Sequence, residues 1–137
     1  MNIFHLAYTV TDLDSARRFY GGLLGCQEGR STDTWVDFNF FGNQLSWHLG
    51  EVVKRSKTNS EVDDISVPVP HFGCVLDWNS FHDLAKKLKS TGILFIVEPT
   101  TRFKGMPGEQ ATMFFEDPFQ NALEFKAYQN PSEGFSK

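Results

Sequence analysis

Two stretches of this sequence repeat one order of residue types: "HLAYTVTDLDSARRFY" (residues 5–20) and "HFGCVLDWNSFHDLAKKL" (residues 71–88). Each starts with a histidine, continues as a short apolar strand and passes through polar residues into a segment with apolar residues at helical spacing. Thr11 or Asp12 can cap the first helix, and Asn79 the second. Each half of the chain therefore begins with the same strand–helix unit.

Strand-like segments with turn residues between them follow each helix. They are "CQEGR" (26–30) and "TWVDFNFFGNQLSWHLG" (34–50) in the first half, and "ILFIVEP" (93–99) and "EQATMFFEDPFQNALEFKAY" (109–128) in the second. Turns are expected at Gly42-Asn43 and at residues 117–121. The order is therefore strand, helix and three strands, and it occurs twice.

This order predicts a single α+β domain in which two βαβββ modules form a curved mixed sheet with helices outside. The expected division is module one at about 1–50, a polar linker at 51–68, module two at about 69–128 and a tail at 129–137. A module of about 60 residues would be only marginally stable alone, so the two modules are expected to pack against each other.

Side chains alternate between the two faces of each predicted strand. One face is bulky and apolar and suits the helices. The other face combines small residues with polar ones, and it collects His5, His48, His71 and Glu124. A curved sheet with such an inner face predicts a cup for a ligand.

Glu124 lies in the middle of a strand that is otherwise built to pack. A buried carboxylate without a partner is costly, so Glu124 must reach solvent, a cation or a proton donor. His5 and His71 occupy the same place in the two repeats, and His48 and Glu124 are interpreted as a second such pair. Two imidazoles and a carboxylate are the ligand set of non-haem Fe(II) oxygenases. The alternative is that Glu124 pairs with Lys126 or an arginine while the histidines bond to the backbone.

The composition excludes several other classes of protein. The net charge is −4 and no cluster of basic residues exceeds two, which argues against a nucleic-acid partner. No apolar run approaches the ~20 residues of a membrane span. The N-terminus has no basic segment of the kind that begins a signal peptide, and the two cysteines make no disulfide framework. A cytoplasmic protein is expected.

The chain resembles the vicinal oxygen chelate superfamily, which includes glyoxalase I, type I extradiol dioxygenases, and fosfomycin- and bleomycin-resistance proteins. The resemblance spans residues 3–128 and is carried by "FHLAYTVTDLDSARRFYGGLLG" and "EDPFQNALEFK". It implies a divalent metal, with Fe²⁺ favoured and Zn²⁺, Mn²⁺ or Ni²⁺ as alternatives. It also implies that the metal ligands are His5, His71 and Glu124. His48 lies near the place of a carboxylate ligand in glyoxalase I and of a catalytic histidine in the extradiol enzymes.

Three functions follow from this reading. The first is a dioxygenase-type, metal-dependent enzyme acting on a small oxygen-chelating substrate, with His48 as a catalytic acid or base. The second is a glyoxalase-type lyase or isomerase, and the third a non-enzymatic binder of the bleomycin-resistance kind. Asn39, Arg102 and Lys126 are the expected substrate-binding residues, and the loop 100–110 is a possible lid. Because the modules leave open sheet edges, and because superfamily members commonly pair, a homodimer is expected.

Overall fold

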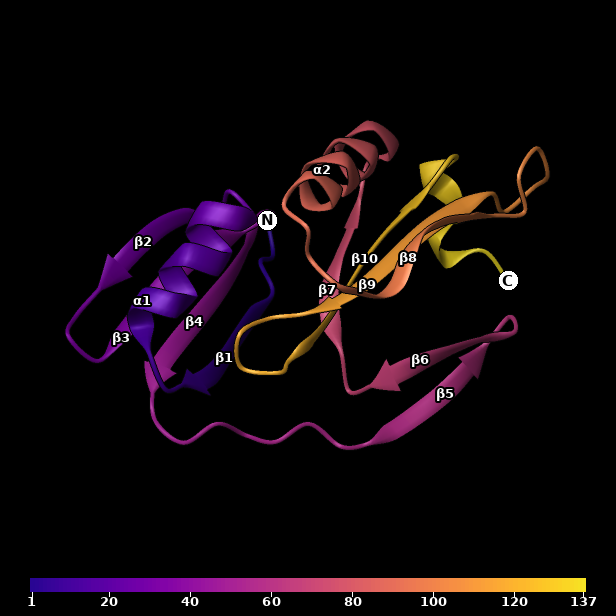
Figure 1. The fold of residues 1–137 in the computed structure, drawn as a ribbon. Coiled ribbons are helices and arrows are strands. Elements are labelled where there is room, and N and C mark those ends of the chain that lie inside the picture. Colours follow the sequence, from indigo (N-terminus) through magenta and orange to yellow (C-terminus); the bar gives the residue numbers. More distant parts are fainter. The chain divides into compact units, whose positions relative to one another are not determined.

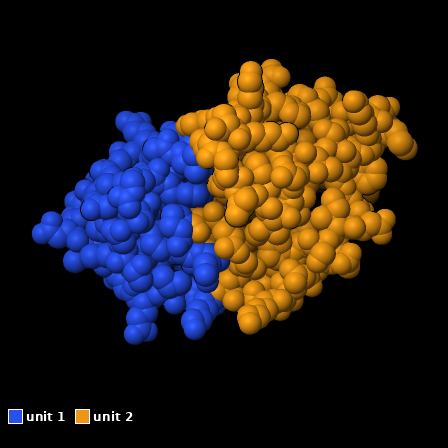
Figure 2. All heavy atoms as spheres, in the orientation of Figure 1, with its two compact units in different colours: residues 1–54, 118–120 blue, residues 55–117, 121–137 orange.

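The computed structural model describes all residues 1–137, which divide into two compact units. Unit 1 comprises residues 1–54 and 118–120, and unit 2 comprises residues 55–117 and 121–137 (Figure 2). The division falls inside the segment that the sequence predicts as a linker. Residues 118–120, which the sequence assigns to module two, belong to unit 1.

Unit 1 contains one helix and a four-stranded sheet (Figure 1). Its elements are β1 (His5–Val10), α1 (Leu13–Ala16), which continues as the π-helix η1 (Arg17–Leu23), β2 (Gln27–Ser31), β3 (Trp35–Phe40) and β4 (Asn43–Leu49). The strands lie in the order β1-β4-β3-β2, with β1 parallel to β4 and the other pairs antiparallel.

Unit 2 repeats this topology. Its elements are β7 (Phe72–Leu76), α2 (Trp78–Ser90), β8 (Phe95–Arg102), β9 (Gln110–Glu116) and β10 (Ala122–Tyr128). The order is β7-β10-β9-β8, with β7 parallel to β10 and the other pairs antiparallel. The prediction of an α+β protein with a twofold βαβββ repeat is confirmed.

Unit 2 also contains a hairpin that lies outside the repeat. Strands β5 (Thr58–Val62) and β6 (Ile65–Val69) form within the segment predicted as a polar linker. Asp63 and Asp64 join them with φ values of 47° and 67°, as a two-residue hairpin turn requires. The sequence hides this hairpin because every residue of β5 is exposed, so no apolar alternation marks the strand. Figure 1 shows the hairpin on the opposite side of the unit 2 sheet from α2.

In the tail, Pro131–Phe135 form the short 3-10 helix η2.

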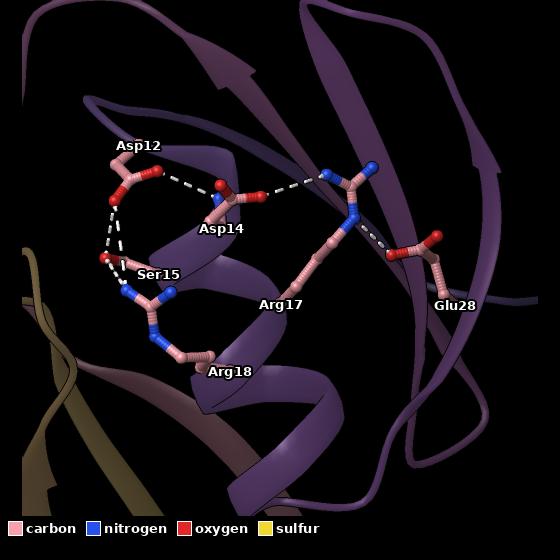
Figure 3. A network of polar contacts seen from close by, with 6 residues as sticks. All are labelled: Asp12, Asp14, Ser15, Arg17, Arg18 and Glu28. Atoms are coloured by element: carbon pink, nitrogen blue, oxygen red, sulfur yellow. Dashed lines mark hydrogen bonds and ion pairs between the residues drawn. The ribbon is translucent and has the colours of Figure 1, made fainter.

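Aspartates begin both helices. The side chain of Asp12 accepts from the Asp14 N–H and the Ser15 hydroxyl, within a network that also contains Arg17 and its ion pair with Glu28 (Figure 3). In α2 the cap is Asp77, which accepts from the Ser80 N–H at 2.8 Å. The expectation of Asn79 as the cap is wrong, because the helix starts at Trp78 and already includes Asn79.

Each unit has its own aromatic core. In unit 1, Tyr20 and Trp47 are fully buried with ring centroids 4.9 Å apart. In unit 2, Phe115 and Phe125 stack at 5.8 Å. These residues lie on the sheet faces that the sequence assigns to the helices. The opposite, polar face of each sheet is therefore the one available to a ligand.

Candidate metal site

Glu124 lies on β10, opposite Gly73 of β7 and Phe114 of β9. Its side chain is only 17% exposed. The hydroxyl of Thr112 donates to Oε2 at 2.6 Å, and Nε2 of His71 lies 3.3 Å from Oε1. The carboxylate therefore has a hydroxyl donor on one oxygen and an imidazole nitrogen facing the other.

His71 immediately precedes β7, and its ring is oriented from behind by the backbone. Nδ1 lies 2.6 Å from the carbonyl oxygen of Pro68, and a carbonyl can only accept, so Nδ1 carries a proton. In the neutral imidazole, the lone pair on Nε2 then points at Glu124 Oε1. An imidazole held by a backbone carbonyl in this way is the usual arrangement of a metal-ligating histidine.

The charges of this pair follow from its surroundings. The hydrogen bond to Glu124 raises the pKa of His71 above its usual value. Burial on its own raises the pKa of Glu124, but hydrogen bonds from His71 and Thr112 outweigh it and hold that pKa below its usual value. Glu124 is therefore ionised at neutral pH. A carboxylate oxygen and an imidazole lone pair facing one another need either a proton or a cation between them.

The separation of the two ligand atoms fits a cation. Metal–nitrogen and metal–oxygen bonds of about 2.1 Å, at the angles of octahedral or tetrahedral sites, place adjacent ligand atoms about 3.0–3.4 Å apart. The observed distance between His71 Nε2 and Glu124 Oε1 is 3.3 Å. No cluster of three or more potential ligand side chains is present, so the pair is what the structure itself brings together.

In unit 1 the corresponding positions follow from the strand register. His5 lies opposite Gln44, and Ala7 lies opposite Ser46, just as Gly73 lies opposite Glu124. If His5 corresponds to His71, as the sequence predicts, Ala7 corresponds to Gly73. Ser46, however, and not His48, is the counterpart of Glu124. The interpretation of His48 as that counterpart is wrong by two residues, because the hairpin turns of the two units differ in length and residue counts do not carry over.

His48 lies opposite Thr9, four residues beyond the register of His5, or about 13 Å along the sheet. It is exposed, and its ring centroid lies 6.2 Å from that of Trp35. At the Glu124-equivalent position, the Ser46 hydroxyl donates to Asp37 of β3 at 2.5 Å. Unit 1 therefore carries an exposed histidine at each of two positions, and its carboxylate lies on the neighbouring strand.

The three expected substrate-binding residues have different surroundings. Asn39 accepts from the Gly42 N–H at 2.8 Å, within a hollow of unit 1 that Asp37 also lines. Arg102 is bound to Asp63 at 2.8 Å. Lys126 lines the same hollow of unit 2 as His71 and Glu124, and its Nζ lies 5.6 Å from the ring centroid of Tyr128.

Comparison with known proteins identifies the family. The family model of the Glyoxalase/Bleomycin resistance protein/Dioxygenase superfamily matches residues 2–125. The chain belongs to this superfamily. A glyoxalase/bleomycin resistance protein/dioxygenase from Alicyclobacillus acidocaldarius is 34% identical, with a TM-score of 0.77 over 98% of this chain and 96% of that one.

Two further proteins are less similar to this chain. Virulence protein STM3117 of Salmonella typhimurium is 25% identical over 128 residues, which cover 92% of this chain and 83% of that protein. The fosfomycin resistance protein FosX of Listeria monocytogenes has the same fold, with a TM-score of 0.67 at 16% identity over 93% of both chains.

No helix of this chain combines the length and the apolar character that a membrane-spanning helix needs.

Sequence reasoning missed the groups that hold the pair in place. Thr112 shares a strand face with Phe114, so its parity could have placed it on the inner face. Nothing in the sequence marks the Pro68 carbonyl, because a backbone acceptor carries no residue-type signal. The wall that β5 and β6 add beside the pair depends on the hairpin that the sequence does not reveal.

Proposed function

We propose that this superfamily member is a divalent-metal-dependent enzyme whose metal ligands are His5, His71 and Glu124. The observation that carries the proposal is the convergence of His71 Nε2 and Glu124 Oε1 at 3.3 Å, each oriented from behind by a separate group. His5 is included because it occupies the same place in the first sequence repeat as His71 does in the second. A divalent metal bound there would act as a Lewis acid, and Fe²⁺ would also bind dioxygen.

The residues of the chain would act around that metal in distinct ways. The Pro68 carbonyl keeps His71 in the tautomer that presents Nε2, and Thr112 keeps one oxygen of Glu124 turned towards it. Lys126, in the same hollow, attracts a negatively charged substrate. Phe114, packed edge-on at 5.0 Å from the His71 ring, excludes water from one side.

A dioxygenase-type reaction on a small oxygen-chelating substrate is the form we favour. Ser46 stands where a second carboxylate ligand would have to be, which leaves two histidines and one carboxylate, the set that suits Fe²⁺ and dioxygen. A glyoxalase-type lyase or isomerase is the second candidate, since it uses the same fold and an adjacent proton-transfer group. A non-enzymatic binder of the bleomycin-resistance kind needs no metal, and a metal-free protein would favour it.

The test is to purify the protein without chelators, load it with Fe²⁺, Zn²⁺, Mn²⁺ or Ni²⁺, and follow dioxygen uptake with vicinal diols and 2-oxo acids as probes. The hemithioacetal of methylglyoxal and glutathione is the probe for lyase activity. Uptake that needs Fe²⁺ and disappears in Glu124→Gln supports the dioxygenase. Turnover without dioxygen, supported by Zn²⁺ or Ni²⁺, replaces it with the lyase.

We also propose that the protein is a cytoplasmic homodimer. Strands β1 and β7 each end their sheet and so have one unpaired edge, and Val75 on β7 is 57% exposed. An open edge next to exposed apolar side chains invites pairing. Sedimentation at micromolar concentration that reveals only a 15.6 kDa species would refute the dimer.

A further inference from the structure

The β5–β6 hairpin adds an apolar wall to the hollow that contains His71 and Glu124. Val62, Ile65 and Val67 lie on one face of the hairpin and line this hollow, which has a volume of about 150 Å³. Val67 is 5% exposed, whereas Val62 at the hairpin tip is 45% exposed. The βαβββ repeat alone would leave this side of the sheet without the wall. The hairpin is therefore the part of unit 2 that can distinguish one substrate from another.

An ion pair fixes the hairpin over the sheet. The guanidinium of Arg102, at the end of β8, lies 2.8 Å from the carboxylate of Asp63 and also donates to the carbonyl of Asp63 at 3.0 Å. The side chain of Arg102 is only 12% exposed. Because this contact holds the tip of the hairpin, the wall is formed before any ligand enters.

The charges in the hollow favour an anion. Asp63 neutralises Arg102, which leaves Lys126 as the cation of the hollow without an ion-pair partner. A divalent metal on the pair would outweigh the single negative charge of Glu124, and Lys126 adds a further positive charge. A ligand that contacts both Lys126 and a metal bound by His71 and Glu124 is therefore stabilised if it carries a negative charge.

We propose that the hairpin makes this site selective for a small oxyanion that carries a short aliphatic group. The oxyanion lies next to Lys126 and to the metal that His71 and Glu124 would bind. The aliphatic group packs against Val62, Ile65 and Val67. This inference rests on the proposed metal-dependent function and names its substrate class. A hollow of 150 Å³ is well below the roughly 300–1,000 Å³ of pockets for larger ligands, so the aliphatic group is short.

Calorimetric titration of the Ni²⁺-loaded protein with 2-oxo acids tests the inference. The series runs from glyoxylate through pyruvate and 2-oxobutanoate to 3-methyl-2-oxobutanoate. We expect affinity to rise about fourfold for each added carbon, because each one is buried against the valines and the isoleucine. An affinity that does not change along the series overturns the inference.

Three variants test the apolar wall and the charge of the hollow. Val62→Ser, at a half-exposed position that tolerates a polar group, is expected to flatten the rise along the series. Val53→Ser, at an exposed position outside the hollow, should leave the rise unchanged. Lys126→Met is expected to weaken all members equally, by about tenfold. An unchanged rise in Val62→Ser contradicts the role of the hairpin.

A readout without metal separates this inference from the proposed function. In the metal-free protein, Arg102→Gln is expected to speed amide hydrogen exchange in residues 58–69 at least tenfold, because the tip of the hairpin is released. Unchanged exchange contradicts the fixed wall, whatever the metal does. A protein that binds no Ni²⁺ overturns the proposed function and its substrate class, whereas metal binding with a flat series overturns the inference alone.

Discussion

Units 1 and 2 share one strand order but place their carboxylates on different strands. In unit 2, Glu124 lies on β10 opposite the apolar Phe114 of β9. In unit 1 the corresponding pair is reversed in character, with Ser46 on β4 opposite Asp37 on β3. Asp37 accepts from Ser46 and, at 3.4 Å, from Gln44, so its oxygens are used within the sheet. Glu124 keeps one oxygen for His71. The same topology thus supports the proposed metal-binding pair in one unit and a self-contained polar pair in the other.

The backbone differs at the matching position as well. Gly73 of β7 lies opposite Glu124, and a Cβ at Gly73 would meet the carbonyl oxygen of Glu124. Its counterpart in unit 1 is Ala7, opposite Ser46, which already has a Cβ. The close approach of β7 and β10 is therefore a property of unit 2 alone, next to its candidate ligands.

The largest effect is expected from Gly73→Ala. The new methyl group collides with backbone that cannot move away without breaking the β7–β10 pairing, so the free energy of unfolding should fall by about 3 kcal/mol. Urea unfolding followed by circular dichroism measures it.

The matched control is Ala7→Gly in unit 1, which removes a methyl group where no such approach exists. It should lower the free energy of unfolding by only about 0.5–1 kcal/mol, which is the usual destabilisation caused by glycine in a strand. Equal losses in the two variants would show that the two strand pairs do not differ in their packing.

The repeated strand–helix pattern was sufficient to predict the fold, because the apolar alternation of β1, β3, β4 and β10 and the helical spacing of apolar residues in both helices are local signals. Strand parity also brought His71 and Glu124 to one face. Register could not be predicted in the same way. Whether Ser46 or His48 faces the β1 position of Ala7 depends on turn geometry, and a one-residue shift in pairing changes every partner. The hairpin was missed because every residue of β5 is exposed, so no apolar alternation marks that strand.

His48→Ala is expected to lower turnover about a hundredfold while leaving bound metal unchanged, if His48 is an acid or base and not a ligand. Metal content and rate are measured on the same preparation. His82→Ala on α2, where the ring packs against Trp78 at 4.7 Å, is the control and should retain both. Loss of metal in His48→Ala would assign it as a ligand, and wild-type behaviour in both measurements would remove it from the site.

Mixing His5→Ala and Glu124→Ala chains tests how units 1 and 2 contribute to one site. If His5 and Glu124 of a site come from different chains, half of the mixed dimers' sites are intact, and an equal mixture should recover about a quarter of wild-type activity. If both come from one chain, no activity returns once chain exchange has been verified by mass spectrometry.

The central proposal is that His5, His71 and Glu124 are metal ligands and that Ser46 is not. Elemental analysis of protein purified without chelators, followed by titration with Ni²⁺, tests this most directly. We expect about one metal ion per chain in the wild type and in Ser46→Ala, and loss of most of it in His5→Ala, His71→Ala and Glu124→Ala, each with circular dichroism like that of the wild type. Full metal content in His71→Ala or Glu124→Ala would contradict the account.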